Sequence, residues 1–179
     1  ELADYVEPYV EIYKIGSGDI TWLEYLDYLS KKNKPIFLAT GASNLKDVED
    51  AANTILKNNE KLVLMQCNTN YTADTDNFNY INLNVLKTFK NLYPNVILGL
   101  SDHTHGHETV LGAITLGARV IEKHFTDSNE KSGPDHKFSM TPKTWSEMVK
   151  SSINLFKSLG NGIKEIEKNE KETSIIQRR

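Results

Sequence analysis

Five short runs of apolar and β-branched residues recur along the chain, and each is nearly continuous rather than alternating with polar residues. The runs are residues 10–15, 35–39, 62–65, 95–100 and 119–124. Continuous runs of this length are typical of strands that are covered on both faces, as in parallel sheets. The pattern therefore predicts five buried parallel strands.

The segments between these runs carry apolar residues at the spacing of amphipathic helices. The apolar stripes are Leu23, Leu26 and Leu29; Leu45, Val48, Ala52, Ile55 and Leu56; Leu83, Leu86, Phe89 and Leu92; Val110, Leu111 and Ile114; and Trp145, Met148, Val149, Ile153 and Phe156. Asn44 is suited to cap the second helix, with Asp47 in its first turn. Pro94 and Gly117 mark the ends of the third and fourth.

Strands that alternate with helices at intervals of about 25–35 residues indicate βαβ units, and right-handed crossovers then give a parallel sheet. This α/β pattern fits an open doubly wound sheet as well as part of a barrel. No Gly-x-Gly-x-x-Gly sequence follows the first strand, which disfavours a dinucleotide-binding fold. In both architectures the functional site lies at the carboxyl ends of the strands, where this chain places its polar residues.

Composition excludes several classes of function. The 179 residues are 39% hydrophobic and 25% charged, which is ordinary for one soluble domain. A net charge of −3 and a pI near 6.0 predict no binding to nucleic acid or to an anionic membrane. No run approaches 18 apolar residues, and no signal peptide is visible. The single cysteine, Cys67, suits a reducing cytoplasm, and heavy use of Lys, Asn and Ile suits a bacterial source.

Two histidines follow the apolar parts of the last two predicted strands. Alternation places Ser101 and His103 on one face of the fourth strand. It likewise places Glu122 and His124 on one face of the fifth. Neighbouring parallel strands end at the same edge, so the two imidazoles should approach each other beside a carboxylate, which suits Mn²⁺. On spacing alone, two unrelated strand-end histidines are an equally good interpretation.

Three further polar segments are candidates for binding. Residues Lys14 to Asp19, after the first strand, combine a lysine, a hydroxyl and two glycines that suit a phosphate or carboxylate, and an ordinary turn is at least as good an interpretation. Thr40, after the second strand, adds a hydrogen-bond donor, with the same alternative. Residues 66–71 form an unusually polar strand end, which fits either a hydrated ligand site or a structural network. Asp135 lies in the long polar loop 126–142 and is suited to bind sugar hydroxyls.

Other polar residues fit structural roles better. We expect His105 and His107 to be loop or helix-cap residues, and Cys67 to be a small core residue rather than a nucleophile. The charged run 164–172 is typical of a solvated face.

Taken together, these segments closely resemble the sialic acid (N-acetylneuraminate) synthase family of bacterial type. The matching motifs are Tyr13-Lys14-Ile15-Gly16-Ser17-Gly18, Ala39-Thr40-Gly41, Gly99-Leu100-Ser101-Asp102-His103-Thr104, Ile121-Glu122-Lys123-His124-Phe125-Thr126 and Gly133-Pro134-Asp135-His136. Their order and spacing agree over nearly the whole chain. The resemblance implies a partial (β/α)8 TIM barrel, strands 4 to 8. Residues 1–160 would form the C-terminal portion of the catalytic barrel, and 161–179 a charged helix or linker towards an absent antifreeze-like domain.

The resemblance also implies a reaction. Phosphoenolpyruvate would condense with an N-acylated aldose such as N-acetylmannosamine to give a sialic or related nonulosonic acid. C3 of phosphoenolpyruvate joins the aldehyde carbon, water adds at C2, and phosphate leaves by C–O cleavage. A divalent metal, Mn²⁺ or alternatively Mg²⁺ or Co²⁺, would be coordinated by His103 and His124 and polarise the aldehyde. The full-length protein would be a cytoplasmic homodimer.

Roles for individual side chains follow from the resemblance. Lys14, Ser17 and Ser101 would hold phosphate or carboxylate oxygens of phosphoenolpyruvate, and Glu122 would lie beside the reacting centre with the two histidines. Tyr71 and Asp135 would face the aldose. Thr69 would take a ligand-facing position. With Thr40, the candidate substrate-binding residues are Lys14, Ser17, Thr40, Thr69, Tyr71, Ser101 and Asp135.

The chain departs from the family pattern in three places. Ala39 stands where many members have Ser, so one phosphate hydroxyl is missing. Residues 66–72 differ from the common His-Cys-Thr sequence, which leaves the sugar open, with legionaminic or pseudaminic acid synthesis as alternatives. The family barrel's first three strands have no counterpart here, and neither does its C-terminal domain. We therefore expect this chain alone to be inactive.

Two other functions stay open on the sequence. One is a module that binds phosphoenolpyruvate or the sugar without turnover. The other is a different TIM-barrel aldolase or lyase, in which Lys14 would form a Schiff base. Lys123 should point away from the barrel interior, because it alternates with Glu122 and His124.

Overall fold

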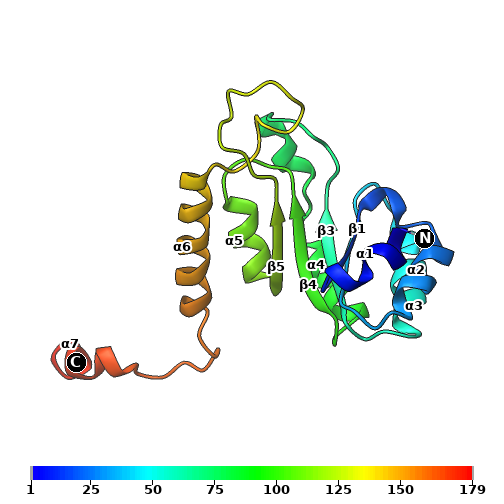
Figure 1. The fold of residues 1–179 in the computed structure, drawn as a ribbon. Helices are drawn as coiled ribbons and strands as arrows, with labels where there is room; N and C mark the ends of the chain where they lie inside the picture. The colour runs from blue at the N-terminus through cyan, green and yellow to red at the C-terminus, as the bar shows by residue number, and fades with distance from the viewer. Residues whose placement is uncertain (1, 179) are drawn as a thin grey trace.

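The computed structural model describes residues 2–178, and its centre is a five-stranded parallel sheet (Figure 1). The strands are β1 (Tyr13–Ile15), β2 (Ile36–Ala39), β3 (Leu62–Cys67), β4 (Ile97–Asp102) and β5 (Ala118–Lys123). They pair in chain order, β1-β2-β3-β4-β5, and every pairing is parallel. Each predicted strand overlaps an observed one, so the prediction of five parallel strands is confirmed.

Helices connect the strands. The α-helices are α1 (Leu2–Val6), α2 (Leu23–Ser30), α3 (Leu45–Leu56), α4 (Val85–Leu92), α5 (Glu108–Thr115), α6 (Pro142–Ser158) and α7 (Lys171–Gln177). Short 3-10 segments are η1 (Glu7–Tyr9), η2 (Ser17–Asp19), η3 (Thr75–Tyr80) and η4 (Lys168–Glu170). Asn44 caps α3 as predicted: its side chain accepts from the Asp47 backbone, and Asp47 accepts from the Asn44 backbone in return.

The order of the strands distinguishes the two architectures that the sequence left open. A doubly wound sheet reverses its strand order at a switch point, which puts helices on both faces. Here each strand adds to the same edge, so right-handed crossovers place α2 to α5 on one face. The arrangement is therefore a portion of a barrel wall, with the helices outside.

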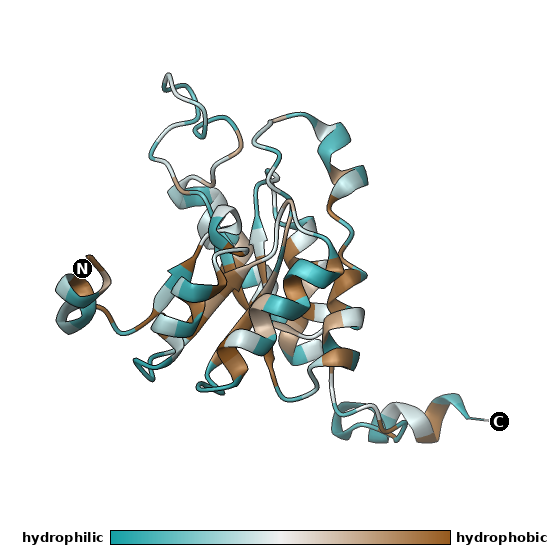
Figure 2. Cartoon of the chain, turned by 90° about the vertical axis from the view of Figure 1, so that its right-hand side faces the viewer, coloured by the Kyte–Doolittle hydropathy of each residue, from teal (hydrophilic) through white to brown (hydrophobic). Residues whose placement is uncertain are grey.

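The core lies between that face and the helices. Ile15, Leu38, Leu64 and Leu98 form one register row across four strands, and each is at most 3% exposed. They belong to one cluster with apolar residues of α2 to α5. Figure 2 shows the hydrophobic, brown segments concentrated in the strands and on the helix sides next to them. The opposite face is partly open, since Ile97 is 51% exposed.

The C-terminal segment leaves the body of the fold after α6. Figure 1 shows α7 away from the sheet, and Ile175 and Ile176 on it are more than 80% exposed. The assignment of 161–179 to a linker towards a further domain stays a prediction, and residue 179 lies outside the described residues. Within residues 2–178, no helix is both long and apolar enough to cross a bilayer.

Candidate active site at the carboxyl ends of the strands

The segments that follow the strands gather at one end of the sheet. In Figure 1 the loop after β5 and the segment after β3 both rise above the carboxyl ends of the strands. The loop after β5 returns to its starting point, because the Thr126 amide donates to the Met140 carbonyl and the Met140 amide to the His124 carbonyl, both at 2.8 Å. These loops enclose the side chains at the ends of β4 and β5.

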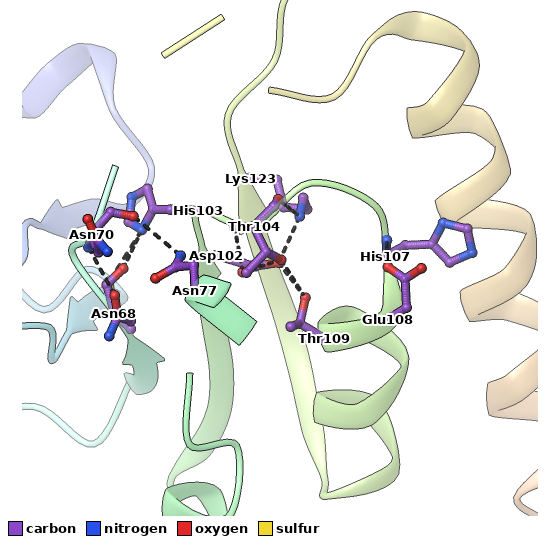
Figure 3. Close-up of polar contacts among 11 residues, drawn as sticks. Asn68, Asn70, Asn77, Asp102, His103, Thr104, His107, Glu108, Thr109 and Lys123 are labelled. Atoms are coloured by element: carbon purple, nitrogen blue, oxygen red, sulfur yellow. Dashed lines mark hydrogen bonds and ion pairs between the residues drawn. The ribbon is translucent and has the colours of Figure 1, made fainter. Parts of the chain in front are cut away.

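The two predicted histidines lie side by side. The ring centroids of His103 and His124 are 5.1 Å apart, as alternation on neighbouring strands required. His103 is buried, and its Nδ1 lies 2.7 Å from the Asn68 carbonyl oxygen (Figure 3). A carbonyl only accepts, so Nδ1 carries the proton and Nε2 keeps its lone pair. Burial lowers the pKa of His103 below its ordinary value, which favours the neutral imidazole.

His124 has a similar arrangement with a carboxylate. Its Nδ1 lies 3.5 Å from Asp135 Oδ2, and its side chain is 31% exposed. An oxygen partner on one ring nitrogen is what orients a metal-binding histidine and fixes its tautomer. The sequence placed Asp135 towards a sugar; the structure also places it beside His124, with nearly half of its side chain exposed.

Two aromatic side chains enclose the imidazoles. The Tyr71 ring lies 4.3 Å from that of His103, and the Phe138 ring lies 5.1 Å from that of His124. Phe138 is only 1% exposed, whereas Tyr71 is 51% exposed. Phe138 therefore excludes water from one side of the two imidazoles, whereas Tyr71 is accessible to solvent.

The donor set fits a divalent ion that takes two ligands from the protein. Each imidazole has an oxygen partner on Nδ1, which leaves Nε2 for the ion. In residues 2–178 no group of three or more His, Cys, Asp and Glu side chains gathers as a ligand set. The remaining positions would fall to water or substrate oxygens, as in open catalytic sites.

Lys14 and Glu122 form an ion pair across the whole sheet, with Nζ 3.4 Å from Oε2. Strands are about 4.8 Å apart, so a flat sheet would separate β1 from β5 by about 19 Å. The pair therefore requires the sheet to curve strongly, as a barrel wall does. Ser101 Oγ donates to the other Glu122 oxygen at 3.2 Å, which brings three predicted site residues together.

Ser17 approaches the same region from the loop after β1. Its Oγ accepts from the Gly41 amide at 2.9 Å. A Cβ on Gly41 would overlap Thr69 Cγ2 and lie 2.8 Å from Ser17 Oγ and 3.0 Å from Cys67 Sγ, so a larger residue would force these side chains to shift. Cys67 is buried, as predicted, and burial raises the pKa of its thiol. Thr40 Oγ1 donates to the Met65 carbonyl at 2.9 Å, so its hydrogen is not directed at a ligand.

The polar end of β3 is mainly a structural network. Gln66 Nε2 donates to the Ile81 carbonyl at 2.9 Å, and Asn68 Nδ2 to the Tyr80 carbonyl at 3.2 Å. These bonds hold the segment after β3 against the strand. Thr69 lines a cavity of about 800 Å³ between the start of α3 and α4, which Thr40 and Cys67 also line. This cavity is next to the histidine pair and does not contain it.

His105, His107 and Lys123 lie outside the histidine pair, as the sequence predicted. The His105 ring meets Phe78 edge-on at 5.8 Å, and His107 precedes α5; neither joins the histidine pair. Lys123 points away from the barrel interior, as alternation predicted, and its ammonium contacts Asp102. Sequence reasoning missed Phe138, because a single phenylalanine in a polar loop carries no signal of where it inserts.

The fold and site define a protein of the (β/α)-barrel class whose polar site lies at the carboxyl ends of the strands. Solved structures agree. The N-acetylneuraminic acid (sialic acid) synthetase of Leptospira borgpetersenii superposes with a TM-score of 0.85 at 30% identity, covering 98% of this chain and 60% of that one. A truncated 3-deoxy-D-arabino-heptulosonate 7-phosphate synthase of Thermotoga maritima shares the fold, with a TM-score of 0.74 at 21% identity.

The sequence model of the NeuB family matches residues 1–164, and the chain belongs to the NeuB family. An N,N'-diacetyllegionaminic acid synthase of Campylobacter jejuni is 40% identical over 95% of this chain and 51% of its own length. The human N-acetylneuraminate-9-phosphate synthase is 28% identical over 88% of this chain and 43% of its own length. The chain thus spans about half the length of the curated relatives that it matches.

Proposed function

We propose that this chain forms part of the barrel of an enzyme that condenses phosphoenolpyruvate with an N-acylated aldose. The products would be a sialic or related nonulosonic acid and phosphate. The observation that carries the proposal is the meeting of Lys14, Ser101 and Glu122 beside His103 and His124 at the carboxyl ends of the strands. Membership of the NeuB family supports it.

The phosphoenolpyruvate would lie against β1 and β4. The Lys14 ammonium and the Ser17 and Ser101 hydroxyls would hold its phosphate and carboxylate oxygens, as fixed donors that need no covalent step. Glu122, which contacts Lys14 and Ser101, would accept a proton from the water that adds at C2. C3 forms the new bond to the aldehyde carbon as the C2–C3 double bond is lost, and the aldehyde oxygen takes up one proton of the water. C2 keeps the water oxygen as its keto oxygen, the bond from C2 to the phosphate oxygen breaks, and the second proton leaves with the phosphate.

A divalent ion, Mn²⁺ or alternatively Mg²⁺ or Co²⁺, would be held by His103 and His124 through Nε2. When bound, it supplies Lewis-acid polarisation of the aldehyde oxygen. Phe138 keeps water from one side of the imidazoles, and burial favours the neutral, metal-binding form of His103. We expect His103→Ala and His124→Ala to abolish Mn²⁺ binding, while His107→Ala, at the N-terminal end of α5, leaves it unchanged.

The aldose would lie near Tyr71 and Asp135, which are both partly exposed. N-acetylmannosamine is the first candidate. The 40% identity to a diacetyllegionaminic acid synthase, against 28% to the human synthase, favours an alternative aldose that carries two acetamido groups. Gln66 and Asn68, which depart from the family pattern, bond to the backbone of the segment after β3. They would therefore influence which sugar binds through the position of Tyr71.

The proposal is tested with the full-length protein, phosphoenolpyruvate labelled with ¹⁸O at the bridging oxygen, and either aldose. We expect aldose-dependent release of phosphate that contains the label, since the C–O bond breaks. Glu122→Gln should lose this activity, whereas the matched change Glu130→Gln in the exposed loop after β5 should keep it. Label retained in the sugar product would contradict the chemistry.

The alternatives give different outcomes in the same assay. A binding module would bind phosphoenolpyruvate without releasing phosphate, and a Schiff-base aldolase would be trapped on Lys14 by borohydride. We expect neither. We also expect the isolated 179 residues to release no phosphate, because they supply only five strands of a barrel wall. The cytoplasmic location and the homodimer stay predictions.

A further inference from the structure

A buried ion pair lies directly behind the two histidines. Asp102 and Lys123 immediately precede His103 and His124, and alternation turns them to the helix side of the sheet (Figure 3). Lys123 Nζ lies 2.7 Å from Asp102 Oδ2, and the two side chains are 1% and 0% exposed. The pair therefore joins the last residue of β4 to the last residue of β5, which are also register partners.

Both charges are fully compensated. Lys123 Nζ also donates to the Thr104 carbonyl at 2.6 Å. Asp102 accepts from the Thr109 hydroxyl at 2.6 Å and from the Thr104 amide at 3.0 Å. Since Thr109 lies in the first turn of α5, the network fixes the two strand ends and the helix that connects them as one unit.

Stability alone does not account for such a pair. Removing two charges from water costs about as much as their attraction returns, so an apolar pair of similar size would stabilise the fold as well or better. What the ion pair adds is one defined geometry. A metal site needs this, because its ligands must be held within about 0.5 Å of their working positions.

We propose that Asp102 and Lys123 are positioning residues for metal binding. By locking the final residues of β4 and β5 together, they fix the separation and orientation of the imidazoles of His103 and His124. The inference rests on the proposed function, because it assumes that these imidazoles bind a divalent ion. Neither Asp102 nor Lys123 would touch the ion or the substrate.

The test replaces Lys123 by Met, which keeps the length of the side chain and removes the charge. A matched control is Lys32→Met: Lys32 is also largely buried (11% exposed) and pairs with Asp4 and Glu7 at 2.7 and 2.6 Å, far from the histidines. The full-length protein is titrated with Mn²⁺ by electron paramagnetic resonance, and the visible spectrum of the Co²⁺-loaded protein is recorded as a measure of ligand geometry.

We expect Lys123→Met to change the Co²⁺ spectrum and to weaken Mn²⁺ binding roughly tenfold, the lower end of what the loss of a partner bonded directly to a ligating histidine costs. Lys32→Met should change neither. Lys123→Arg, which keeps the charge, should restore most of the affinity. If Lys123→Met does not fold, the double change Asp102→Asn with Lys123→Met leaves no unpaired buried charge, and it should show the same loss.

The outcomes separate the inference from the proposed function. Unchanged Mn²⁺ affinity and an unchanged Co²⁺ spectrum in folded Lys123→Met or in the double variant would overturn the inference and leave the proposed function standing. Equal losses in Lys32→Met and Lys123→Met would overturn it too, because the effect would then be one of general stability. A wild-type protein that binds no Mn²⁺ would overturn the metal site and the inference together.

Discussion

Phe138 offers a sharp test of how the loop after β5 is attached to the site. The side chain is 1% exposed, and its ring lies 5.1 Å from that of His124 and 6.0 Å from that of His103. Residues 130–134 of the same loop are exposed. We therefore expect Phe138→Ala to remove an apolar anchor of the loop, next to the equally buried Met140. Phe125→Ala is the matched control: it begins the same loop, but it is 58% exposed, and its ring meets that of Trp145 edge-on at 5.7 Å.

The size of the effect follows from burial. Fully burying a phenylalanine side chain stabilises by about 1.5–3 kcal/mol, and truncation to alanine in a core costs about 3–5 kcal/mol once the cavity is included. The loop can collapse into part of the cavity, so we expect Phe138→Ala to lower the free energy of unfolding by about 3 kcal/mol. Phe125 is less than half buried and leaves no cavity, and its truncation should cost about 1 kcal/mol or less.

Urea unfolding followed by circular dichroism measures both free energies of unfolding, provided that the m-values of the variants match. Amide hydrogen exchange adds the local view: exchange in residues 126–140 should rise in Phe138→Ala and stay unchanged in Phe125→Ala. If Phe138→Ala costs no more than Phe125→Ala, or if exchange in the loop does not change, the ring is not the anchor and the reasoning fails.

Two further predictions concern the loop after β2 and the free cysteine. Gly41→Ala should destabilise by about 1–3 kcal/mol in urea unfolding, because the new Cβ would press on Thr69 Cγ2 and Ser17 Oγ, whereas Gly18→Ala, with nothing within 4 Å, should be nearly neutral. Burial raises the pKa of Cys67 above its ordinary value, so at pH 8 the native protein holds less thiolate and should react with iodoacetamide more slowly than the urea-unfolded chain. The rate at which native Cys67 reacts with iodoacetamide should still be rising above pH 9. Equal rates in the native and the unfolded protein would contradict the raised pKa.

Much of the fold followed from local patterns, because each strand is a continuous apolar run and α3 carries its own cap. The bounds of β1 did not follow. Residues 10–12 continue the apolar pattern but are not in the strand, since β2 begins at Ile36, the partner of Tyr13, and offers no partner further back. Segment η3 was also missed, because six residues of 3-10 helix are too short to show a helical period of apolar positions.

The site was predictable to the extent that alternation along a strand fixes it. His103 and His124 could be placed together because they lie on neighbouring strands in the same phase. The contact of Lys14 with Glu122 could not, since β1 and β5 are the two edges of the sheet, and only its curvature brings them together. The orientation of the Gln66 side chain likewise could not be predicted, because its partner, the Ile81 carbonyl, lies in the segment that follows β3.

The same alternation explains how two short motifs serve two purposes at once. Within residues 101–103 and 122–124, every second side chain faces the barrel interior and the one between faces the helices. Interior side chains can reach a ligand, whereas the outward ones can act only through the backbone that they share with their neighbours. A substitution at an outward position should therefore change the geometry and affinity of the site without removing a contact to the substrate. This is why metal affinity and the Co²⁺ spectrum, rather than the loss of activity alone, distinguish the ion pair from the histidines that it holds.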